Sequence, residues 1–574
     1  MRRQYDGFWF PPAVRDAIIT PERAFEVLHF KGGGWVSDPG DDTVTVRWPR
    51  LELSDWQQVL SLLERNQRNT SQGNTSDRLP RAMQRMKVLW SDRSSPLRQD
   101  ILEALETCTG HSMGMLDISL SLLDMMSVED LQRASNCQFT HAVKNQFAAL
   151  DGLPGKIRFF VDGWWSSRAT QALLRLESYR QRRWQLRRQR TERVLGYAAG
   201  NVPGTGLLIV LLALAATAEQ SIRPPVILVR NSRREPLFTP LVLTALELVD
   251  RGLLNTTLVT LWDHADTALQ ESLFAQADLV VAAASDETIE DIGQKVQRVS
   301  SVTHPIRFHG HGHKVSFSTV GRECLRLGKR TPLNEVPLVD AVALLASLDV
   351  ALWNQQGCLS SRVHFLEQGN DAEYHPPEVY GQAVVRGLRT LNKLIPKGIS
   401  RKRQIHNLFD KYQAVGASGP VKVLSDYDDD FLVVLERRPL TATQFGELVN
   451  DCQGRTVAII PVDDVMEIPE RYLRYVHRTH LQSMSVALGN PDEPGIDPRL
   501  LRYAEALGAV GVTGIRTVGR GAFPQLAYSW DGLIPLDLTA KRQKGYFTAL
   551  EFDEPWVQIH ETHRLVRQAI ENRM

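Results

Sequence analysis

Cysteine is scarce in this chain, and its distribution excludes a fold held together by disulfides. The 574 residues include five cysteines, an odd number spread widely along the sequence. Small secreted domains instead carry an even set of closely spaced cysteines that pair with one another. We therefore predict free thiols and a reducing, cytoplasmic compartment.

An excess of charge of either sign is also missing. Lys and Arg number 67 against 66 Asp and Glu, so the formal net charge is +1. A balanced chain has no general attraction for nucleic acid or for an anionic membrane surface. One segment, residues 175–193, concentrates eight arginines. We interpret it as an exposed helix face and expect no nucleic-acid partner.

Long hydrophobic runs are absent as well. The most apolar stretch, Gly206 to Ala218, has 13 residues, whereas a bilayer-spanning helix needs about 20. We predict a buried helix there and no membrane span. The first residues, "MRRQYDGFWFPP", lack the continuous apolar core of a secretory signal, which agrees with the cytoplasmic expectation.

The sequence does contain short β-branched runs that alternate with helical segments from about Lys156 onward. This pattern is typical of βαβ units and a parallel sheet. The runs are "KIRFFVDG", "VLGYAAGN", "PVILVRNS", "TTLVTLWD", "ADLVVAAAS" and "PIRFHGHGHKVSFSTV". We predict an α/β fold with a Rossmann-type nucleotide-binding domain. The expected regions are a mainly helical N-terminal region (1–150), the nucleotide-binding domain (151–331), an α/β catalytic domain (332–465) and a C-terminal segment that completes the fold (466–574).

Cys358 lies in a sequence context that differs from that of the other cysteines. It follows the run "LVDAVALLASLDVALW", which resembles a buried strand, and the turn-forming "NQQG". A buried cysteine is often only a small apolar residue. In a turn, however, backbone N–H groups can lower the pKa of a thiol and hold a developing oxyanion. Cys358 is therefore a candidate nucleophile.

The segment "AGNVPGTG" (199–206) joins a predicted strand to the apolar helix through a glycine-rich turn. Its glycines, Gly200, Gly204 and Gly206, do not have the spacing of the dinucleotide fingerprint. The turn is either a tight strand–helix connection or a place where a ligand approaches the backbone and the free N–H groups of the helix start. Asn201 provides an amide that can donate a hydrogen bond to an oxyanion.

Five segments in order resemble one known family, and two more segments agree with it. They are "GYAAGNVPGTGLLIVLLALA", "VILVRNSRREPLFTPLVL", "ADLVVAAASDETIEDIG", "HGHKVSFSTVG" and "WNQQGCLSSRVHFLEQ", with the helical "ILEALETCTGHSMGMLDISLSLL" and the late "YSWDGLIPLDL". Together they resemble the LuxC-type acyl-CoA reductases of the aldehyde dehydrogenase superfamily. The resemblance implies an aldehyde-dehydrogenase-like fold and the reduction of a fatty acyl-CoA or acyl-carrier thioester to the aldehyde.

The resemblance also assigns two catalytic roles. Cys358 matches the nucleophile that holds the acyl group as a thioester. Asn201 matches the amide that forms the oxyanion hole with the backbone N–H of Cys358. Hydrolytic relatives place a glutamate where this chain has "RFHGHGHKVSF". Without that base, water is not activated against the acyl-enzyme, which suits a reductase.

A cofactor site follows from the same resemblance. The loop "VRNSRREPL" matches the segment that grips the adenosine ribose, and it places Arg233 where NAD-preferring relatives carry a glutamate. With Arg230 and Arg234 beside it, and Ser232 as a further candidate in the same loop, this favours the 2′-phosphate of NADPH, although a solvated basic turn is the alternative. Gly204 and Ser285 match positions near the cofactor pyrophosphate, and Ser285 is equally explained as a helix N-cap.

Three histidines of the same stretch remain open. His309, His311 and His313 would share one face of a continuous strand. They fit a structural role, a proton donor to the aldehyde oxygen or a metal site, and because no further ligand has a recognisable spacing we predict no metal.

The glutamate that orients the nicotinamide ribose in many relatives has no clear match here. Asp429, Asp430 and Glu436 are the candidates, and a solvated acidic turn is the alternative. By analogy with relatives we expect a homo-oligomer, and a partner enzyme that supplies or consumes the acyl group is possible. The arginine-rich segment could dock the phosphates of coenzyme A or an acidic carrier.

Two other functions remain open. Cys358 could serve an acyltransferase or a thioesterase with a histidine of the 309–313 stretch as base. Alternatively, the chain could be a non-catalytic scaffold with an aldehyde-dehydrogenase-like fold that binds a partner enzyme.

Overall fold

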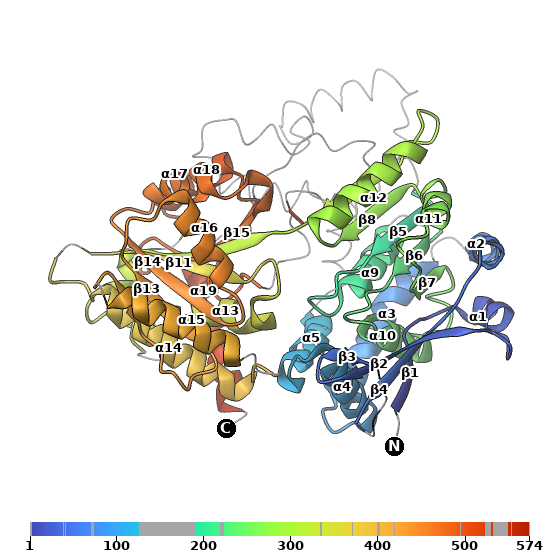
Figure 1. Ribbon diagram of the computed structural model, residues 1–574, viewed down its shortest axis with the longest axis horizontal. Coiled ribbons are helices and arrows are strands. Elements are labelled where there is room, and N and C mark those ends of the chain that lie inside the picture. The colour runs from blue at the N-terminus through green and yellow to red at the C-terminus, as the bar shows by residue number, and fades with distance from the viewer. Residues whose placement is uncertain are drawn as a thin grey trace. The chain divides into compact units, whose positions relative to one another are not determined.

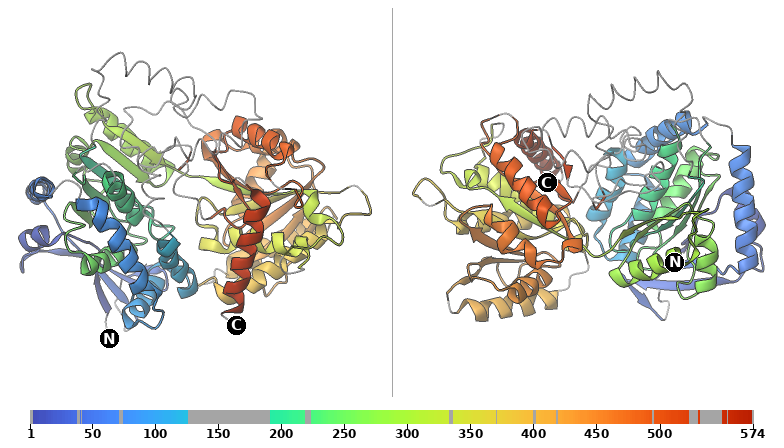
Figure 2. Two further views of the ribbon diagram at one scale, coloured as in Figure 1. Left: turned by 180° about the vertical axis from the view of Figure 1, so that it is seen from behind. Right: turned by 90° about the horizontal axis from the view of Figure 1, so that it is seen from above.

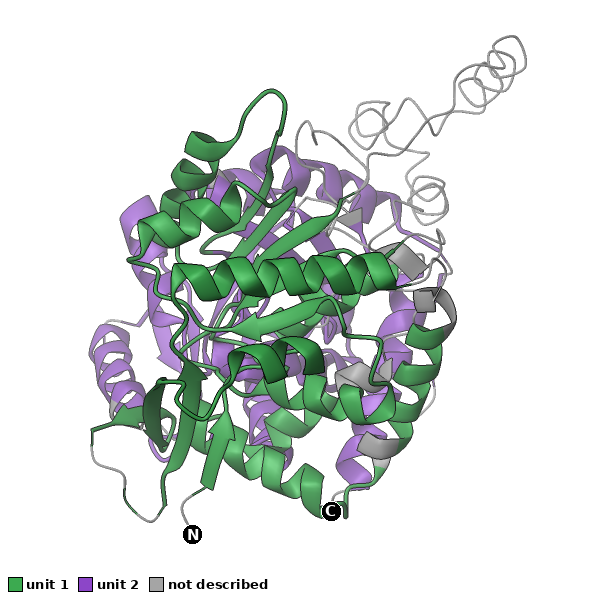
Figure 3. Cartoon of the chain, turned by 90° about the vertical axis from the view of Figure 1, so that its right-hand side faces the viewer, with its two compact units in different colours: residues 1–139, 182–313, 534–543 green, residues 140–181, 314–533, 544–574 purple. Residues whose placement is uncertain are grey.

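The structure is a computed structural model that describes most of the chain. The described residues are 3–37, 40, 42–70, 74–125, 191–218, 223–332, 336–369, 371–398, 402–417, 419–493, 495–522, 530–531, 549–552 and 554–572. The chain forms two compact units, shown in different colours in Figure 3. Unit 1 comprises residues 1–139, 182–313 and 534–543, and unit 2 comprises 140–181, 314–533 and 544–574. The predicted elements within 156–163, 175–190 and 532–538 lie outside the described residues.

Unit 1 is built on a five-stranded sheet in which every neighbouring pair is parallel. The strand order is β7-β6-β5-β8-β9 (Figure 1). The strands are β5 (Arg193–Tyr197), β6 (Val226–Arg230), β7 (Thr257–Thr260), β8 (Leu279–Ala283) and β9 (Arg307–His311). The helices that connect them are α9 (Thr205–Ala218), α10 (Phe238–Val249), α11 (Thr267–Phe274) and α12 (Asp286–Val299). The α/β fold expected from the alternating runs is confirmed.

Helix α9 is the apolar helix predicted from its composition. Ile209, Val210 and Leu212 are fully buried. The helix is apolar on every side because it packs between strands β5 and β6 and two other helices, α10 and α3 (Asn74–Ser91).

The first 125 residues combine a sheet with helices. The four strands, in the order β1-β4-β2-β3, are β1 (Arg3–Asp6), β4 (Val44–Pro49), β2 (Phe25–Lys31) and β3 (Gly34–Val36). Besides α3, the helices are α1 (Pro12–Ile18), α2 (Leu53–Asn69), α4 (Pro96–Thr109) and α5 (Met113–Met125). Of these strands, β4 has the β-branched sequence "VTVRWP" that is typical of a strand. Trp9 forms a bridge with Val259 of β7, so this region packs on the five-stranded sheet and belongs to the same unit.

Unit 2 contains an eight-stranded sheet in the order β12-β13-β14-β11-β10-β15-β16-β17. All of its pairs are parallel except β12 with β13. The strands are β10 (Val315–Val320), β11 (Ser361–Glu367), β12 (Val421–Val423), β13 (Leu432–Glu436), β14 (Thr456–Val462), β15 (Leu481–Ala487), β16 (Gly514–Thr517) and β17 (Ala549–Leu550). The helices are α13 (Leu338–Ala351), α14 (Pro377–Leu394), α15 (Lys402–Gly416), α16 (Ala442–Asp451), α17 (Glu467–Arg471), α18 (Pro498–Val510) and α19 (Pro555–Glu571).

The two faces of this sheet are both covered. Helices α13 and α19 contact each other, and they contact β11 and the pair β15 and β16, respectively (Figure 2). Phe317, Phe365, Phe445 and Tyr472 pack ring against ring in the core cluster that also takes in α16 and α18. The strands are therefore buried along nearly their whole length, as parallel strands covered on both faces are, and β10, β11 and β15 carry polar residues among their apolar ones.

The run before Cys358 is a helix, so the interpretation as a buried strand was wrong. Residues 338–351 form α13, in which nearly every residue is buried. A run that is apolar on all sides has no helical or strand periodicity, and its length of 14 residues favours a helix. Helix α13 and the four residues after it, Leu338–Gln355, form the one described segment that is apolar and long enough to span a membrane. Within the protein, 89% of that segment is buried.

The predicted single strand "PIRFHGHGHKVSFSTV" is two strands in different sheets. β9 closes the sheet of unit 1, and β10 lies in the middle of the sheet of unit 2. The chain therefore passes between the units at residues 313 and 314, ahead of the predicted boundary at residue 331. β10 pairs with β11, the strand that follows Cys358. The three histidines therefore lie in unit 1, whereas Cys358 lies in unit 2.

Candidate functional site

In unit 1, two of the predicted cofactor residues, Gly204 and Ser285, lie at the topological switch point of the sheet, and Arg230, Ser232 and Arg233 lie at the end of the neighbouring strand β6 and in the loop after it. β5 is followed in the chain by its neighbour on one side, β6, and β8 is followed by its neighbour on the other side, β9. In open parallel sheets, ligands bind at the carboxyl ends of two adjacent strands whose connections diverge in this way. Asn201 and Gly204 follow β5, and Ser285 follows β8.

The loop after β5 needs its glycines for close packing. A Cβ atom on Gly200 would lie 2.1 Å from Oγ of Ser232, in the loop after β6. Gly204 has a φ of 98° immediately before α9 begins, a conformation that L-residues with a side chain rarely adopt. Between them, Asn201 is partly buried, and its carbonyl oxygen lies 3.4 Å from Nε2 of His111. This loop is therefore packed against its neighbours.

Ser285 is the N-cap of α12. Its side chain accepts a hydrogen bond from the backbone N–H of Thr288, and Asp286 and Glu287 occupy the first turn, where acidic residues complement the helix dipole. The N-cap role is therefore observed. The role near the pyrophosphate stays a prediction, and both roles use the same helix start.

The three arginines at the end of β6 and in the loop after it have different surroundings. Arg230 donates from Nε to the carbonyl oxygen of Trp262, and its guanidinium lies 5.9 Å from the ring centre of Tyr197. Burial lowers the pKa of Arg230 below its usual range. Arg233 is ion-paired with Glu26 at 2.9 Å, whereas Arg234 is exposed.

In unit 2, Cys358 lies in a turn that precedes β11, after a backbone segment of unusual conformation. Trp353, Asn354 and Gln355 have φ values of 54°, 50° and 58°. Consecutive left-handed residues other than glycine carry steric strain of about 1 kcal/mol or more each, and such strain persists only when the surroundings impose it. The turn around Cys358 confirms the "NQQG" expectation.

Two side chains impose this conformation. Nε2 of Gln355 donates to the carbonyl oxygens of Ser361 and Thr456, and its Oε1 accepts from the backbone N–H of Thr456, at 2.8 to 2.9 Å. Asn354 donates to the carbonyl oxygen of Lys397 and accepts from Nε of Arg455. The segment that carries Cys358 is thus tied to strands β11 and β14.

The Cys358 backbone is also held from β10. Oγ of Ser316 donates to the carbonyl oxygen of Cys358 at 2.7 Å, and Oγ of Ser483 on β15 donates to Oγ of Ser316 at 2.9 Å. Both serines are buried. Side chains and backbone groups of four neighbouring strands, β14, β11, β10 and β15, therefore define the position of this turn.

The pKa of the Cys358 thiol is raised to about 11, the reverse of the shift expected from the turn. Burial is the largest cause, and the carboxylate of Asp531 adds to it. A hydrogen bond from Gln482 and the backbone N–H of Cys358 itself lower the pKa by a smaller amount. The backbone effect predicted from the sequence is present, but desolvation of the thiolate outweighs it.

Cys358 still differs from the other described cysteines. It is partly exposed, whereas Cys108, Cys324 and Cys452 are buried. Burial raises the pKa of Cys452 to about 12 and the pKa values of Cys108 and Cys324 well above the usual range. All four are free thiols, as predicted for these positions, and Cys358 is the one that is only partly buried.

The three histidines are not arranged as a continuous strand would arrange them. His309 and His311 lie on the buried face of β9, while His313 is exposed beyond the end of the strand. The backbone N–H of His313 donates to Asp286 at 2.7 Å. Among the described residues there is no cluster of three or more side chains that could hold a metal ion.

The candidate carboxylates lie at opposite ends of the parallel strands of this sheet. Asp429 and Asp430 precede β13, and Cys358 precedes β11, and these strands run parallel on either side of β14. Glu436 is the last residue of β13, at the carboxyl end of the strands, and is paired with Arg438 at 2.6 Å. Asp429 is paired with Arg389. Of the three candidates, only the two aspartates therefore lie at the amino ends of the strands, as Cys358 does.

Residues near Cys358 that the sequence did not predict include Gln482 and a buried ion pair. Gln482 donates to Asp531, and Arg516 is ion-paired with Glu551, both side chains of that pair being almost fully buried. These residues come from chain segments more than one hundred positions after Cys358. The sequence signal that could have indicated this ion pair is the charged Arg516 within the short strand β16.

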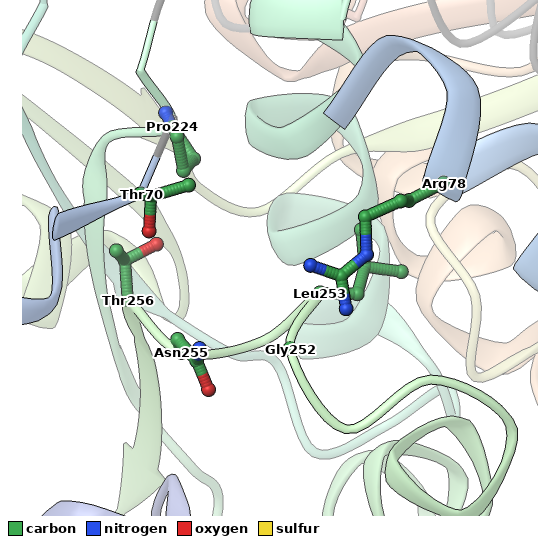
Figure 4. Close-up of a pocket in the computed structure, with 7 residues that line it drawn as sticks. All are labelled: Thr70, Arg78, Pro224, Gly252, Leu253, Asn255 and Thr256. Carbon is green, nitrogen blue, oxygen red and sulfur yellow. The ribbon is translucent and has the colours of Figure 1, made fainter. Parts of the chain in front are cut away.

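A pocket elsewhere in unit 1 has no relation to these residues. Figure 4 shows it. Arg78 reaches into it and is ion-paired with Asp250, and a Cβ on Gly252 would lie 2.3 Å from the Arg78 guanidinium. The pocket is lined by Thr70, Arg78, Pro224, Gly252, Leu253, Asn255 and Thr256. It is therefore occupied by a side chain of the protein itself.

Comparison with solved structures shows the same fold in aldehyde dehydrogenases. Aldehyde dehydrogenase 21 from Physcomitrella patens matches with a TM-score of 0.53 and 10% identity, over 98% of this chain and 97% of that chain. An NAD-dependent benzaldehyde dehydrogenase from Corynebacterium glutamicum matches with a TM-score of 0.49 and 12% identity, over 87% and 96%. At such low identity, the similarity establishes the fold alone.

Sequence comparison gives the family. No curated protein matches the chain. The model of the family described as "Acyl-CoA reductase (LuxC)" matches residues 169–542, well over half of the sequence, and these residues include both the switch point and Cys358. The chain therefore belongs to the LuxC family of acyl-CoA reductases and has the aldehyde-dehydrogenase-like fold that its sequence motifs indicated.

Proposed function

We propose that this protein reduces a long-chain fatty acyl-CoA or acyl-carrier thioester to the aldehyde with NADPH, through a thioester on Cys358. Family membership supports acyl-CoA reduction in general. The observation that carries the covalent step is the setting of Cys358, the one partly exposed cysteine among the four described, in a turn that buried side chains hold in place.

Cys358 provides the nucleophile. Its sulfur bonds to the thioester carbon, the bond from that carbon to the departing sulfur breaks, and the departing thiol leaves with a proton. Because the pKa of Cys358 is about 11, the thiol enters the reaction protonated at neutral pH and must lose its proton as the substrate is attacked. Asp531 is the carboxylate whose charge acts on this thiol, and it is our candidate for a group that receives the proton.

Two N–H donors are proposed to stabilise the oxyanion. One is the backbone N–H of Cys358, and the other is the side-chain amide of Asn201. Such donors contribute most when the structure holds them in place before the reaction. The contacts of Ser316 and Gln355 meet that condition for the Cys358 turn.

The residues at the switch point of unit 1 fit a nicotinamide dinucleotide. The glycine-dependent loop after β5 and the N-terminus of α12 offer backbone N–H groups to a pyrophosphate. We assign Gly204 and Ser285 to this end, and Ser232 and Arg233, supported by the inward-packed Arg230, to the adenosine ribose. The reduced nicotinamide, when bound, would supply hydride to the acyl carbon. The bond from that carbon to the Cys358 sulfur then breaks, which releases the aldehyde, and a proton returns to the sulfur. Asp429 or Asp430 remains the candidate for the nicotinamide ribose.

The acyl-enzyme also has to survive until it is reduced. The segment 307–317 carries no carboxylate, so the base that activates water in hydrolytic relatives is missing there. This absence favours reduction over hydrolysis. The free thiols agree with the proposed cytoplasmic location, and a homo-oligomer remains an expectation by analogy.

The proposal is tested by incubating the purified protein with a long-chain acyl-CoA and NADPH, and following both cofactor absorbance and aldehyde. We expect one aldehyde per cofactor oxidised. The Cys358→Ala variant is expected to lose at least about 10³-fold in kcat, since no covalent route remains. Cys452→Ala is the matched control, because that thiol is buried in the core of the same unit.

Other outcomes would change the assignment. Hydrolysis or acyl transfer without cofactor oxidation would favour a thioesterase or an acyltransferase. Inertness toward thioesters would favour the scaffold function. Full activity of Cys358→Ala would remove Cys358 from the mechanism.

A further inference from the structure

A hairpin from the N-terminal sheet contacts the loop that follows β6. Glu26 on β2 is paired with the guanidinium of Arg233, with Oε1 2.9 Å from Nη2. Trp35 on β3 donates from its indole N–H to the carbonyl oxygen of Arg233 at 3.2 Å. Both strands of the hairpin therefore hold the same residue, one by its side chain and the other by its backbone.

The hairpin has its own support. β2 pairs with β4 over six residue pairs, and the N–H of Gly33, in the tight turn, donates to the carbonyl oxygen of Thr107 on α4 at 2.8 Å. Gly33 has a φ of 77°, and a Cβ there would meet the backbone of Gly110 at 2.8 Å. The Glu26 carboxylate is thus presented from a fixed sheet rather than from a mobile loop.

The loop after β6 lies where nucleotide-binding folds of this kind recognise the adenosine ribose of the coenzyme. It follows β6, the strand next to the first strand of the five-stranded sheet. In nucleotide-binding folds of this kind, a carboxylate at this position binds the ribose hydroxyls of NAD, or an arginine accommodates the 2′-phosphate of NADP. Here the loop provides Arg233, and a carboxylate reaches it from a different element of the fold.

Arg233 is the arginine on which these contacts converge. Arg230 is occupied by Trp262 and packs over Tyr197, and Arg234 is exposed. Nη2 of Arg233 faces Glu26, while its Nε is buried and has no hydrogen-bond partner among the described residues. The guanidinium of Arg233 is therefore paired with Glu26 through Nη2 and keeps an unsatisfied donor at Nε.

We propose that Glu26 is a coenzyme-selectivity residue. Its carboxylate accepts hydrogen bonds from the adenosine ribose hydroxyls of NADH, and it opposes the 2′-phosphate of NADPH by repulsion and by competing for Arg233. The inference rests on the proposed function, in that a nicotinamide dinucleotide must bind at this loop. Selectivity for NADPH is then smaller than Arg233 alone would produce.

The test measures binding of NADP⁺ and NAD⁺ to the full chain by titration calorimetry, which is independent of turnover. For Glu26→Gln we expect the Kd for NADP⁺ to fall about fivefold, since a partly exposed ion pair no longer competes, and the Kd for NAD⁺ to rise. Arg233→Gln should raise the Kd for NADP⁺. In the Arg233→Gln background, Glu26→Gln should improve NADP⁺ binding less than it does in the parent chain.

A matched control is Glu103→Gln. Glu103 is paired with Arg3 at similar exposure, and Arg3 lies on β1, at the other edge of the same sheet from β3. This variant should leave both Kd values unchanged. A Glu26→Gln variant that binds NADP⁺ more weakly would show that Glu26 orients Arg233 instead, and unchanged affinities would remove the hairpin from selectivity. If the parent chain binds neither coenzyme, the proposed function fails as well.

Discussion

At the scale of single residues, the reactivity of Cys358 is a question of protonation. With a pKa of about 11, about one thiol in a thousand is ionised at pH 8. The cause is loss of water around the sulfur together with the charge of Asp531. A thiol with this pKa reacts slowly with unspecific electrophiles, and it must be activated when the substrate arrives.

The first prediction at this scale concerns Asp531. Removing its negative charge lowers the pKa of the Cys358 thiol, so Asp531→Asn should be alkylated by iodoacetamide several-fold faster at pH 8 than the parent chain. Asparagine also tolerates the φ of 53° at this position. The measurement is the rate of Cys358 labelling by mass spectrometry from pH 7 to 11.

The sign of the pH dependence follows from the direction of the shift. Labelling of the parent chain should still be rising at pH 11, where about half of the thiol is ionised, and the curve of Asp531→Asn should reach its midpoint at lower pH. Gln482→Ala should move the midpoint upward, because the hydrogen bond that lowers the pKa is lost. Labelling that is independent of pH in all three chains would contradict this account of the thiol.

At the scale of secondary-structure elements, the connection between α13 and β11 is the feature on which the site depends. Three successive left-handed residues are unfavourable for the isolated chain, so the fold must hold them. The three hydrogen bonds of Gln355 join this connection to β11 and β14. The position of the nucleophile is therefore set by the sheet.

Gln355→Ala tests this dependence. The substitution leaves buried backbone groups of Ser361 and Thr456 without partners, and we expect a loss of about 2–4 kcal/mol in local stability. Hydrogen exchange should accelerate for the amides of 353–361, and the acylation rate of Cys358 should fall. Gln356→Ala is the control, because Gln356 is the exposed neighbour. Equal exchange in both variants would show that Gln355 does not hold the turn.

At the scale of the whole molecule, the proposed chemistry draws on both units. Cys358 and its contacts with Ser316 and Gln482 lie in unit 2, whereas Asn201 and the proposed cofactor residues lie in unit 1. Acylation of Cys358 should therefore proceed without coenzyme, and coenzyme should bind to Cys358→Ala.

Asn201→Ala tests whether the units act together. If the Asn201 amide stabilises the oxyanion, its removal should slow acylation of Cys358 by about 10²–10³-fold, although the two residues belong to different units. The measurement is intact-protein mass spectrometry after rapid mixing with acyl-CoA in the absence of NADPH. Coenzyme affinity is the control and should be nearly unchanged. An unaltered acylation rate would remove Asn201 from the oxyanion hole.

The sequence by itself determined the parts of this protein that depend on local patterns. The apolar runs indicated the parallel sheet of unit 1 and the buried helix α9, because strands and helices covered on all sides need continuous apolar residues. The turn at Cys358 and the family were also readable from short motifs. All of these are properties of neighbouring residues.

Only the tertiary structure decided the rest. Residues 338–351 are apolar on every side, so their pattern has no period, and the packing of α13 made them a helix. Three features depend on residues far apart in the chain. They are the desolvation of Cys358, the contact of Glu26 with Arg233, and the placement of Asp429 and Glu436 at opposite ends of the strands. Burial and charge depend on which segments meet in space, and no local pattern of residues contains that information.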